Sequence, residues 1–421
     1  MYQRLNSFLR SIVGNKLFSG SILILVGSTL SNAGNYLYHL FMGRMLGPAD
    51  YGLLASLISL TYMISVPIGT IRLSLVKEIS SFYKKNSEIK KTYDWILAKS
   101  IPVYILLALL AIPLSSVISK SINIGHTDLV FVMLISGIVG LYTTINQSFL
   151  QGMQEFFKLS VVGILGSATK LILALALVVL GYGVFGATSS FLVTSLIVGV
   201  VTYICLKKLL KSGERKRFRP KIKLSSVILP IFLLNLAYTS LYSTDIILAK
   251  RFLSASDAGF YAALSTLGKI IFFAISPIIT VMFPITAEKH SGGGNHKKVF
   301  RLSLMFVVFI CLGLFLIYLF FPKTMVLALY GKGYLPIIKY LKYFALIFSL
   351  SSISYLLINY FVSIKKTKSV ILYALAAVVQ VVAIYLFHES LMQLAIVSLA
   401  VMIWLLFSLV GYYFYNEKRE S

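Results

Sequence analysis

The chain has 421 residues, of which 58% are hydrophobic and only 12% charged, and its mean hydropathy is +0.89. Soluble domains carry roughly a quarter of charged residues, whereas the apolar residues here come in blocks of about 20 or more, long enough to cross a bilayer. This composition excludes a soluble enzyme and predicts an integral membrane protein, so the net charge of +26 does not indicate a nucleic-acid partner.

Taken in chain order, the apolar blocks predict about twelve membrane-spanning helices. The first block is too long for the apolar core of a signal peptide and lacks an A-x-A cleavage site, so we expect it to be the first span. Each span must be helical, because lipid offers no partners for backbone N–H and C=O groups. The expected spans are residues 18–46, 51–76, 95–119, 128–151, 159–180, 184–206, 226–250, 257–285, 299–321, 335–361, 369–387 and 391–415.

Basic side chains are unevenly distributed between alternate loops. Most of the 39 Lys and Arg lie in the two termini and in the loops that follow the even-numbered spans. The positive-inside rule places that side of the membrane in the cytoplasm, so we expect both termini to be cytoplasmic. The largest basic block is Lys207–Lys223, which we interpret as a loop that contacts anionic lipids.

Two short stretches of the sequence are similar to each other. They are GRMLGPADYGLLA (43–55) and KRFLSASDAGFYA (250–262), and each joins the first two spans of one half of the chain. This placement predicts two parallel six-span repeats, related by an axis along the membrane normal. The expected domains are an N-terminal lobe of residues 1–206, a basic cytoplasmic linker of residues 207–224 and a C-terminal lobe of residues 225–421.

An arginine, an aspartate and a glycine recur within this repeat. The arginine is expected at the C-terminal end of a helix, where a cation is favourable, and the aspartate is expected to cap the next helix. The glycine is expected to let the two helices of each hairpin approach closely. The three pairs are Arg44 and Arg251, Asp50 and Asp257, and Gly52 and Gly259.

The first span of each half also carries polar residues at helical spacing, so that they share one face. A polar face in lipid is costly unless it contacts other helices or a water-filled cavity. Two interpretations remain open: hydrogen bonds between helices, or two polar stripes that line a central lumen. The residues are Ser28, Asn32, Asn35 and His39 in the first half, and Asn235, Thr239, Tyr242 and Asp245 in the second.

Several cationic side chains lie within apolar runs. Lys170 and Lys269 are the deepest, and each would cost about 3 kcal/mol at the bilayer centre if it faced lipid, so we expect both to face the protein interior. Arg72 and Lys99 lie nearer the cytoplasmic ends of their spans and can snorkel. Asp245 is essentially the only acidic counterpart, so a cavity with this balance would attract an anion. Asp245 itself is either a structural partner of a cation or a proton or ion site.

Motifs along nearly the whole chain resemble those of the polysaccharide (O-antigen) flippases of the multidrug/oligosaccharidyl-lipid/polysaccharide (MOP) exporter superfamily. Besides the first repeated stretch, the motifs that carry this resemblance are LQGMQEFFKLS (150–160), GYGVFGAT (181–188), TDIILAKRFLSASDAGFYAALS (244–265) and LALYGKGYLPII (327–338). The resemblance implies an all-α, V-shaped transporter of the bacterial inner membrane with two six-helix lobes. Such a transporter moves undecaprenyl-diphosphate-linked oligosaccharide, for O-antigen or another surface polysaccharide, to the periplasmic leaflet by alternating access.

The resemblance also implies a cationic cavity, for which Arg72, Lys170 and Lys269 are the candidates by position. Around them, Asn32, Asn35, His39, Asn235, Tyr242 and Asp245 are the candidate polar and coupling residues. Membrane lipids, a coupling ion (H⁺ or Na⁺) and other polysaccharide-assembly proteins are the further partners that the resemblance suggests.

Two alternative functions remain open. A multidrug exporter of the same superfamily would need acidic residues in its cavity, which this chain scarcely offers. A membrane-bound glycan polymerase or glycosyltransferase would need a large outer loop or paired carboxylates, and the sequence shows neither an acid/base pair nor a His/Cys metal cluster. We therefore expect a transporter rather than an enzyme, with no catalytic residue, metal or cofactor.

Overall fold

The computed structural model describes residues 16–82, 86–210 and 228–420, and these are almost entirely helical. Within this part of the chain, ten helical segments are long and apolar enough to cross a membrane. The predicted all-helical, multi-pass membrane fold is therefore confirmed. Most of the predicted linker, residues 207–224, lies outside the described residues.

The first of these ten segments contains a sharp turn. Helix α2 (Lys16–Ser81) is interrupted at Gly47, whose φ of 74° and ψ of 176° are non-helical. A positive φ strains residues that carry a Cβ but not glycine, and Pro48 directly after it suits the first position of a new helix. The break falls at the predicted turn between the first two spans, so α2 consists of two arms.

A second long segment, Phe156–Leu209, also contains a break. Helices α5 (Phe156–Leu177) and α6 (Gly183–Leu209) are joined by a π-helical turn in which Gly181 and Gly183 both have positive φ. This break again coincides with a predicted turn. Because two of the ten segments contain such turns, the number of membrane crossings exceeds ten if each arm crosses, and the total of twelve stays a prediction.

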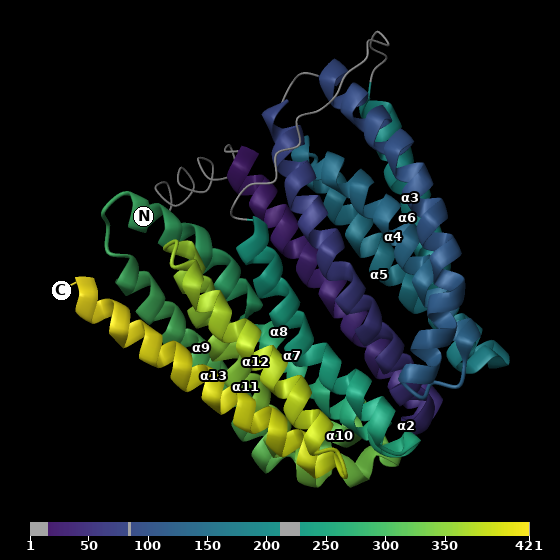
Figure 1. The fold of residues 1–421 in the computed structure, drawn as a ribbon, viewed down its shortest axis with the longest axis vertical. Helices are drawn as coiled ribbons and strands as arrows, with labels where there is room; N and C mark the ends of the chain where they lie inside the picture. The colour runs from purple at the N-terminus through teal and green to yellow at the C-terminus, as the bar shows by residue number, and fades with distance from the viewer. Residues whose placement is uncertain (1–15, 83–85, 211–227, 421) are drawn as a thin grey trace, which may run out of the picture. The chain divides into compact units, whose positions relative to one another are not determined.

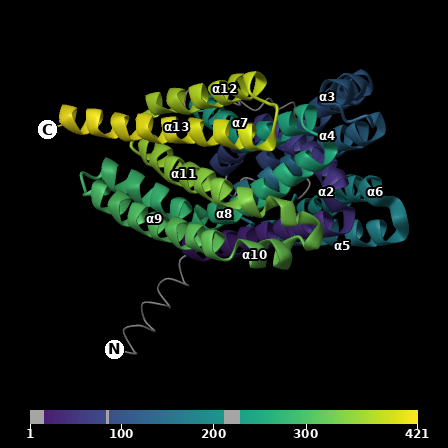
Figure 2. The ribbon, with the colours of Figure 1, turned by 90° about the horizontal axis from the view of Figure 1, so that it is seen from below.

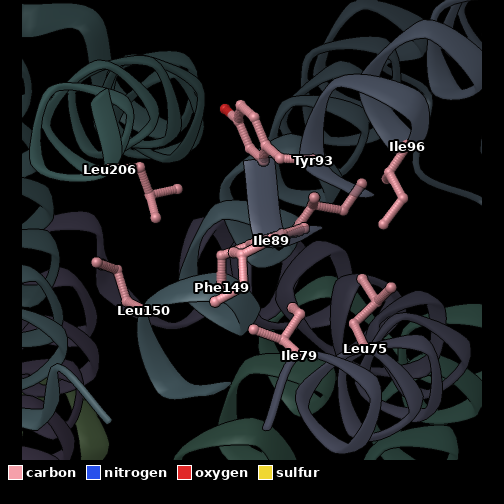
Figure 3. Close-up of a cluster of buried hydrophobic side chains, with 9 residues drawn as sticks. Leu75, Ile79, Ile89, Tyr93, Ile96, Phe149, Leu150 and Leu206 are labelled. Carbon is pink, nitrogen blue, oxygen red and sulfur yellow. The ribbon is translucent and has the colours of Figure 1, made fainter. Parts of the chain in front are cut away.

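The chain divides into two compact units, which we describe separately. The first unit contains the described residues within 1–41, 67–120 and 125–228. In it, α6 packs against both α5 and α4 (Thr127–Gly152), and α3 (Asn86–Ser121) begins next to the second arm of α2. Figure 3 shows the apolar cluster that joins α2, α3, α4 and α6. Its labelled members are Leu75, Ile79, Ile89, Tyr93, Ile96, Phe149, Leu150 and Leu206.

The second unit contains the described residues within 42–66, 121–124 and 229–421. Helix α11 packs against α8, α9 and α13, and α12 packs against α13 (Figures 1 and 2). Since α11 and the turn before it form the most buried of the ten segments, α11 is the core helix of this unit. The helices are α7 (Ile228–Phe252), α8 (Ala255–Ser291), α9 (His296–Phe320), α10 (Pro322–Leu329), α11 (Ile338–Ser363), α12 (Val370–Leu386) and α13 (Leu391–Glu420).

Helix α10 replaces what the sequence analysis treated as a simple turn at residues 322–333. Pro322 stands at its start, where the missing N–H costs nothing. The chain then passes Gly331, at φ 88°, into a 3₁₀ turn before α11 begins. The predicted loop is therefore a short helix whose C-terminal carbonyls are available to a neighbour.

The two copies of the repeated stretch pack directly against each other in the second unit. A Cβ added to Gly52 would lie 2.6 Å from the backbone nitrogen of Gly259, and a Cβ on Gly259 would lie 1.7 Å from the carbonyl oxygen of Pro48. Close approach was predicted within each hairpin, but the structure places it between the two copies. Sequence similarity identified the recurring glycine, but it carried no information about which surface lies opposite.

The two recurring arginines make equivalent hydrogen bonds, each to a helix end in the other half of the sequence. The guanidinium of Arg44 donates to the carbonyls of Leu327 and Ala328, 3.0 and 2.6 Å away, at the end of α10. Arg251 donates to the carbonyl of Ser121, the last residue of α3, and its own carbonyl accepts a bond from Asn123. Each arginine thus binds the end of a helix that belongs to the other half of the sequence.

Helix α8 begins with a capping arrangement that differs from the prediction. Ser254, not Asp257, is the N-cap: its hydroxyl accepts a bond from the Asp257 backbone N–H at 3.1 Å. The same hydroxyl donates to the Asp257 carboxylate at 2.8 Å. This is a variant of the capping box, in which the aspartate supports the cap from the first turn of the helix.

Candidate functional site

In the first unit, Lys170 lies inside α5, eight residues before the π-helical turn at Val178, and is half-buried. Its ammonium donates to the Asn35 side-chain oxygen at 2.5 Å and lies 5.0 Å and 4.7 Å from the ring centres of Tyr38 and Phe191. These two rings meet edge-to-face at 5.4 Å, so α2, α5 and α6 together form an amide-and-aromatic setting for the cation. Aromatic faces attract a cation without neutralising its charge.

The other predicted residues of the first unit lie apart from this cluster or at its edge. Arg72, in the second arm of α2, is half-buried and donates from Nε to the side chain of Gln151 at 3.1 Å. His39 is half-buried, with its ring edge-to-face against Tyr38 at 5.9 Å, while Asn32 is exposed. The predicted stripe therefore lies on α2, and its member Asn35 accepts the hydrogen bond from Lys170.

In the second unit, Lys269 lies near the middle of α8 and is half-buried. Its ammonium lies 5.1 Å from the ring centre of Tyr242 on α7, and it interacts electrostatically with Asp245. Tyr242 and Asp245 were both predicted as polar members of this span. Asn235, two turns before Tyr242 on α7, is half-buried.

Asp245 is buried, with 5% of its surface exposed, and it anchors a polar network. One carboxylate oxygen accepts the Ile246 backbone N–H at 2.8 Å, and the other accepts the Tyr261 hydroxyl at 2.9 Å. The network continues from Tyr261 to Ser398 on α13 at 3.4 Å, and from Gln380 on α12 to Ser398 at 3.2 Å. A buried carboxylate held in this way has its hydrogen bonds satisfied, and it also interacts electrostatically with Lys269, although the two form no ion pair within 4.0 Å.

Both deep lysines lack a close carboxylate. Among the described residues, the ion pairs within 4.0 Å join Lys90 to Asp94, His126 to Asp128 and Lys158 to Glu155, and none involves Arg72, Lys170 or Lys269. In that same part of the chain, no group of three or more His, Cys, Asp or Glu could hold a metal ion. In the first unit, Lys170 therefore lies among neutral groups, whereas in the second unit Lys269 has Asp245 nearby without forming an ion pair within 4.0 Å.

Sequence reasoning missed the aromatic partners of these cations. Tyr38 and Phe191 lie beside Lys170, and Tyr261 lies beside Asp245, each on a different helix from the charged group. Apolar spans contain too many aromatic residues for the relevant ones to stand out. The i, i+4 spacing of Tyr238 and Tyr242 was a signal that could have marked the aromatic face near Lys269.

A comparison with protein-family models gives a match over residues 41–339 to the family described as "Polysaccharide biosynthesis protein". The chain belongs to this polysaccharide biosynthesis family. The match covers most of the chain, including both copies of the repeated stretch and both deep lysines. A comparison of the chain with curated proteins gives no significant match.

Solved structures similar to this polysaccharide biosynthesis protein are MOP superfamily transporters. A multidrug resistance MATE transporter in an inward-facing conformation is 15% identical, with a TM-score of 0.74, over 92% of this chain and 94% of the other. The lipid II flippase MurJ, in an inward closed conformation, is 15% identical, with a TM-score of 0.72, over 93% and 87%. A MOP transporter from Pyrococcus furiosus, described as having a binding pocket of reverse polarity, is 18% identical, with a TM-score of 0.60, over 96% and 97%. The predicted MOP-type fold and the family resemblance are confirmed.

Proposed function

We propose that this protein is a flippase that moves a lipid-linked oligosaccharide with an anionic diphosphate from the cytoplasmic to the outer leaflet of the bacterial inner membrane. The observation that carries the proposal is a deep lysine without a close carboxylate in each unit, Lys170 and Lys269. A lysine in the middle of a membrane costs about 3 kcal/mol when it faces lipid. Contact with a polar ligand would avoid this cost and so explains why a lysine lies at this depth.

The chemistry of these lysines favours an anion. The Lys170 ammonium is held by an amide and aromatic faces, which position the cation but leave its charge for a ligand; the Lys269 ammonium lies over an aromatic face and interacts with Asp245 without an ion pair within 4.0 Å. A diphosphate offers several charged acceptor oxygens for charge-assisted hydrogen bonds. Membership of a polysaccharide biosynthesis family and a fold shared with a lipid II flippase support undecaprenyl-diphosphate-linked oligosaccharide as the substrate.

The proposal includes alternating access between two lobes, residues 1–206 and 225–421, with both termini in the cytoplasm. The network of Asp245, Tyr261, Ser398 and Gln380 is the candidate coupling site for H⁺ or Na⁺. The network joins α7, α8, α12 and α13, so a change in the charge of Asp245 would alter hydrogen bonds that connect four helices. Its interaction with Lys269 links the coupling site to the anion site.

Flipping of a fluorescent undecaprenyl-diphosphate-linked oligosaccharide in proteoliposomes tests the proposal. We expect the wild type to flip the lipid and the Lys170→Gln/Lys269→Gln double variant to lose most of that activity. Lys99→Gln is the matched control, because Lys99 lies in a membrane segment but is exposed. Absence of flipping by the folded wild type, or flipping unaffected in the double variant, would overturn the proposal.

The multidrug exporter remains the alternative, since MATE transporters share this fold. It predicts that lipophilic cations compete with the lipid-linked substrate, whereas an anion-receptive site predicts competition by inorganic diphosphate. Measuring inhibition of flipping by both compounds separates the two functions.

A further inference from the structure

An aromatic group lies next to Lys269 in the second unit. Tyr238 lies 4.4 Å from Tyr355, 4.8 Å from Tyr242 and 5.3 Å from Phe272, measured between ring centres. Tyr62, in the second arm of α2, adjoins Tyr242 at 6.4 Å. We name Tyr62, Tyr238, Tyr242, Phe272 and Tyr355 the aromatic platform.

Helical spacing puts the platform and the cation on the same side of their helices. Tyr238 and Tyr242 are one turn apart on α7, and Lys269 and Phe272 are one turn apart on α8. The Lys269 ammonium lies over the Tyr242 ring at 5.1 Å. A cation and several aromatic rings therefore lie next to one another, within the span of one ligand.

The position of the platform in its helices is unusual for tyrosine. Membrane proteins concentrate tyrosine at the two bilayer interfaces, where the hydroxyl reaches water. Tyr238, Tyr242 and Tyr62 instead lie near the middle of their helical arms, and all five platform residues are half-buried. Lipid offers no partner to a phenol, so the part of these tyrosines that stays exposed at this depth suits a polar ligand or water better than lipid.

Such a surface is suited to a sugar ring. A pyranose has a C–H face that packs on an aromatic ring and hydroxyls at its edge that bond to phenols, whereas an acyl chain would use neither the phenols nor the lysine. The Tyr238 and Tyr355 rings pack against each other, with centres 4.4 Å apart and planes inclined by 31°, so a sugar would pack on an outward-facing ring surface of this pair. Lys269 at its edge suits the phosphate that precedes the first sugar.

We infer that the aromatic platform of Tyr62, Tyr238, Tyr242, Phe272 and Tyr355 binds the first sugar of the lipid-linked substrate while Lys269 binds its diphosphate. The inference rests on the proposed function and adds a sugar subsite to it. The platform then distinguishes a glycosylated lipid from the bare polyprenyl diphosphate that remains after the sugars are transferred. The protein would accordingly favour loaded carrier over empty carrier.

Binding measurements with four probes test this inference. The full-length protein is titrated in detergent with undecaprenyl diphosphate and with the same lipid carrying one glucose, galactose or N-acetylglucosamine. We expect at least one glycosylated lipid to bind about tenfold more tightly than the bare diphosphate, the size of effect that aromatic packing supplies. In Tyr238→Leu/Tyr355→Leu this gain is lost while affinity for the bare diphosphate is kept, which also shows that the variant is folded.

Matched variants sharpen the test. Tyr238→Phe/Tyr355→Phe keeps the rings and most of the sugar gain, whereas Lys269→Gln weakens all four lipids by a similar factor. Tyr203→Leu, at a partly exposed tyrosine of α6, leaves every affinity unchanged. Should the double leucine variant fail to fold, the single Tyr355→Leu variant serves in its place.

The outcomes separate the two proposals. No sugar gain in the wild type for any of the three sugars, or a gain that persists in the leucine variant, overturns the sugar subsite but leaves the flippase. A wild type that binds neither the bare nor the glycosylated lipids overturns the proposed function and the subsite with it.

Discussion

The contact between the two repeated stretches predicts an unusually large effect of a single methyl group. In Gly259→Ala the new Cβ would lie 1.7 Å from the Pro48 carbonyl oxygen, whereas contacts below 3.0 Å force a shift. The carbonyl must therefore retreat by roughly 1.3 Å, the difference between these distances, and it belongs to backbone that cannot rotate away. Overpacking of this kind costs about 1–3 kcal/mol and occasionally more.

Gly313→Ala on α9 is the matched control, because nothing lies within 4 Å of a Cβ at that position. There the change should be neutral or should stabilise the helix by up to about 1 kcal/mol. Thermal unfolding of the two variants in detergent is the assay, and we expect Gly259→Ala to melt measurably below both the wild type and Gly313→Ala. Equal melting temperatures for the two alanine variants would refute the packing argument.

Three further changes test separate features. Arg44→Gln should lower the melting temperature because the carbonyls at the end of α10 lose their charged donor, and Arg44→Lys should recover part of it; an unchanged Arg44→Gln curve contradicts the bonding described. Ser254→Ala should cost about 1 kcal/mol by removing the N-cap of α8, against little change for the exposed Ser256→Ala, and equal effects would contradict the cap. Asp245→Asn should abolish stimulation of flipping by an imposed H⁺ or Na⁺ gradient while flipping without a gradient persists; stimulation that survives removes Asp245 from coupling.

The helices and their main turns could be predicted from the sequence because hydropathy and glycine placement are local signals. The break at Gly47 and the turn at Gly181 and Gly183 fall where the sequence analysis expected them. Helix α10 could not be predicted, because its eight residues are too short to show a periodic pattern. The cap of α8 was assigned to Asp257 because both Ser254 and Asp257 are good capping residues, and only backbone geometry distinguishes them.

The two deep lysines could be identified as candidate site residues from the sequence alone, because a cation inside an apolar span carries a large free-energy cost if it faces lipid. Their surroundings could not. Lys170 is placed by Asn35 and Phe191, and Asp245 by Tyr261, which in turn contacts Ser398. Some of these partners lie on the next helix and others on helices far away in the chain, and tertiary packing brings them together. A single sequence contains no record of such pairings.

The reciprocal contacts between the two halves of the sequence indicate how the chain originated. Gly52 faces Gly259, Arg44 binds the end of a helix in the C-terminal half, and Arg251 binds the end of a helix in the N-terminal half. In a twofold homodimer, residue i of one subunit contacts residue j of the other and the same contact occurs twice. A six-helix ancestor with one such glycine and one such arginine would form these contacts as a dimer, and duplication with fusion of its gene would leave them inside one polypeptide.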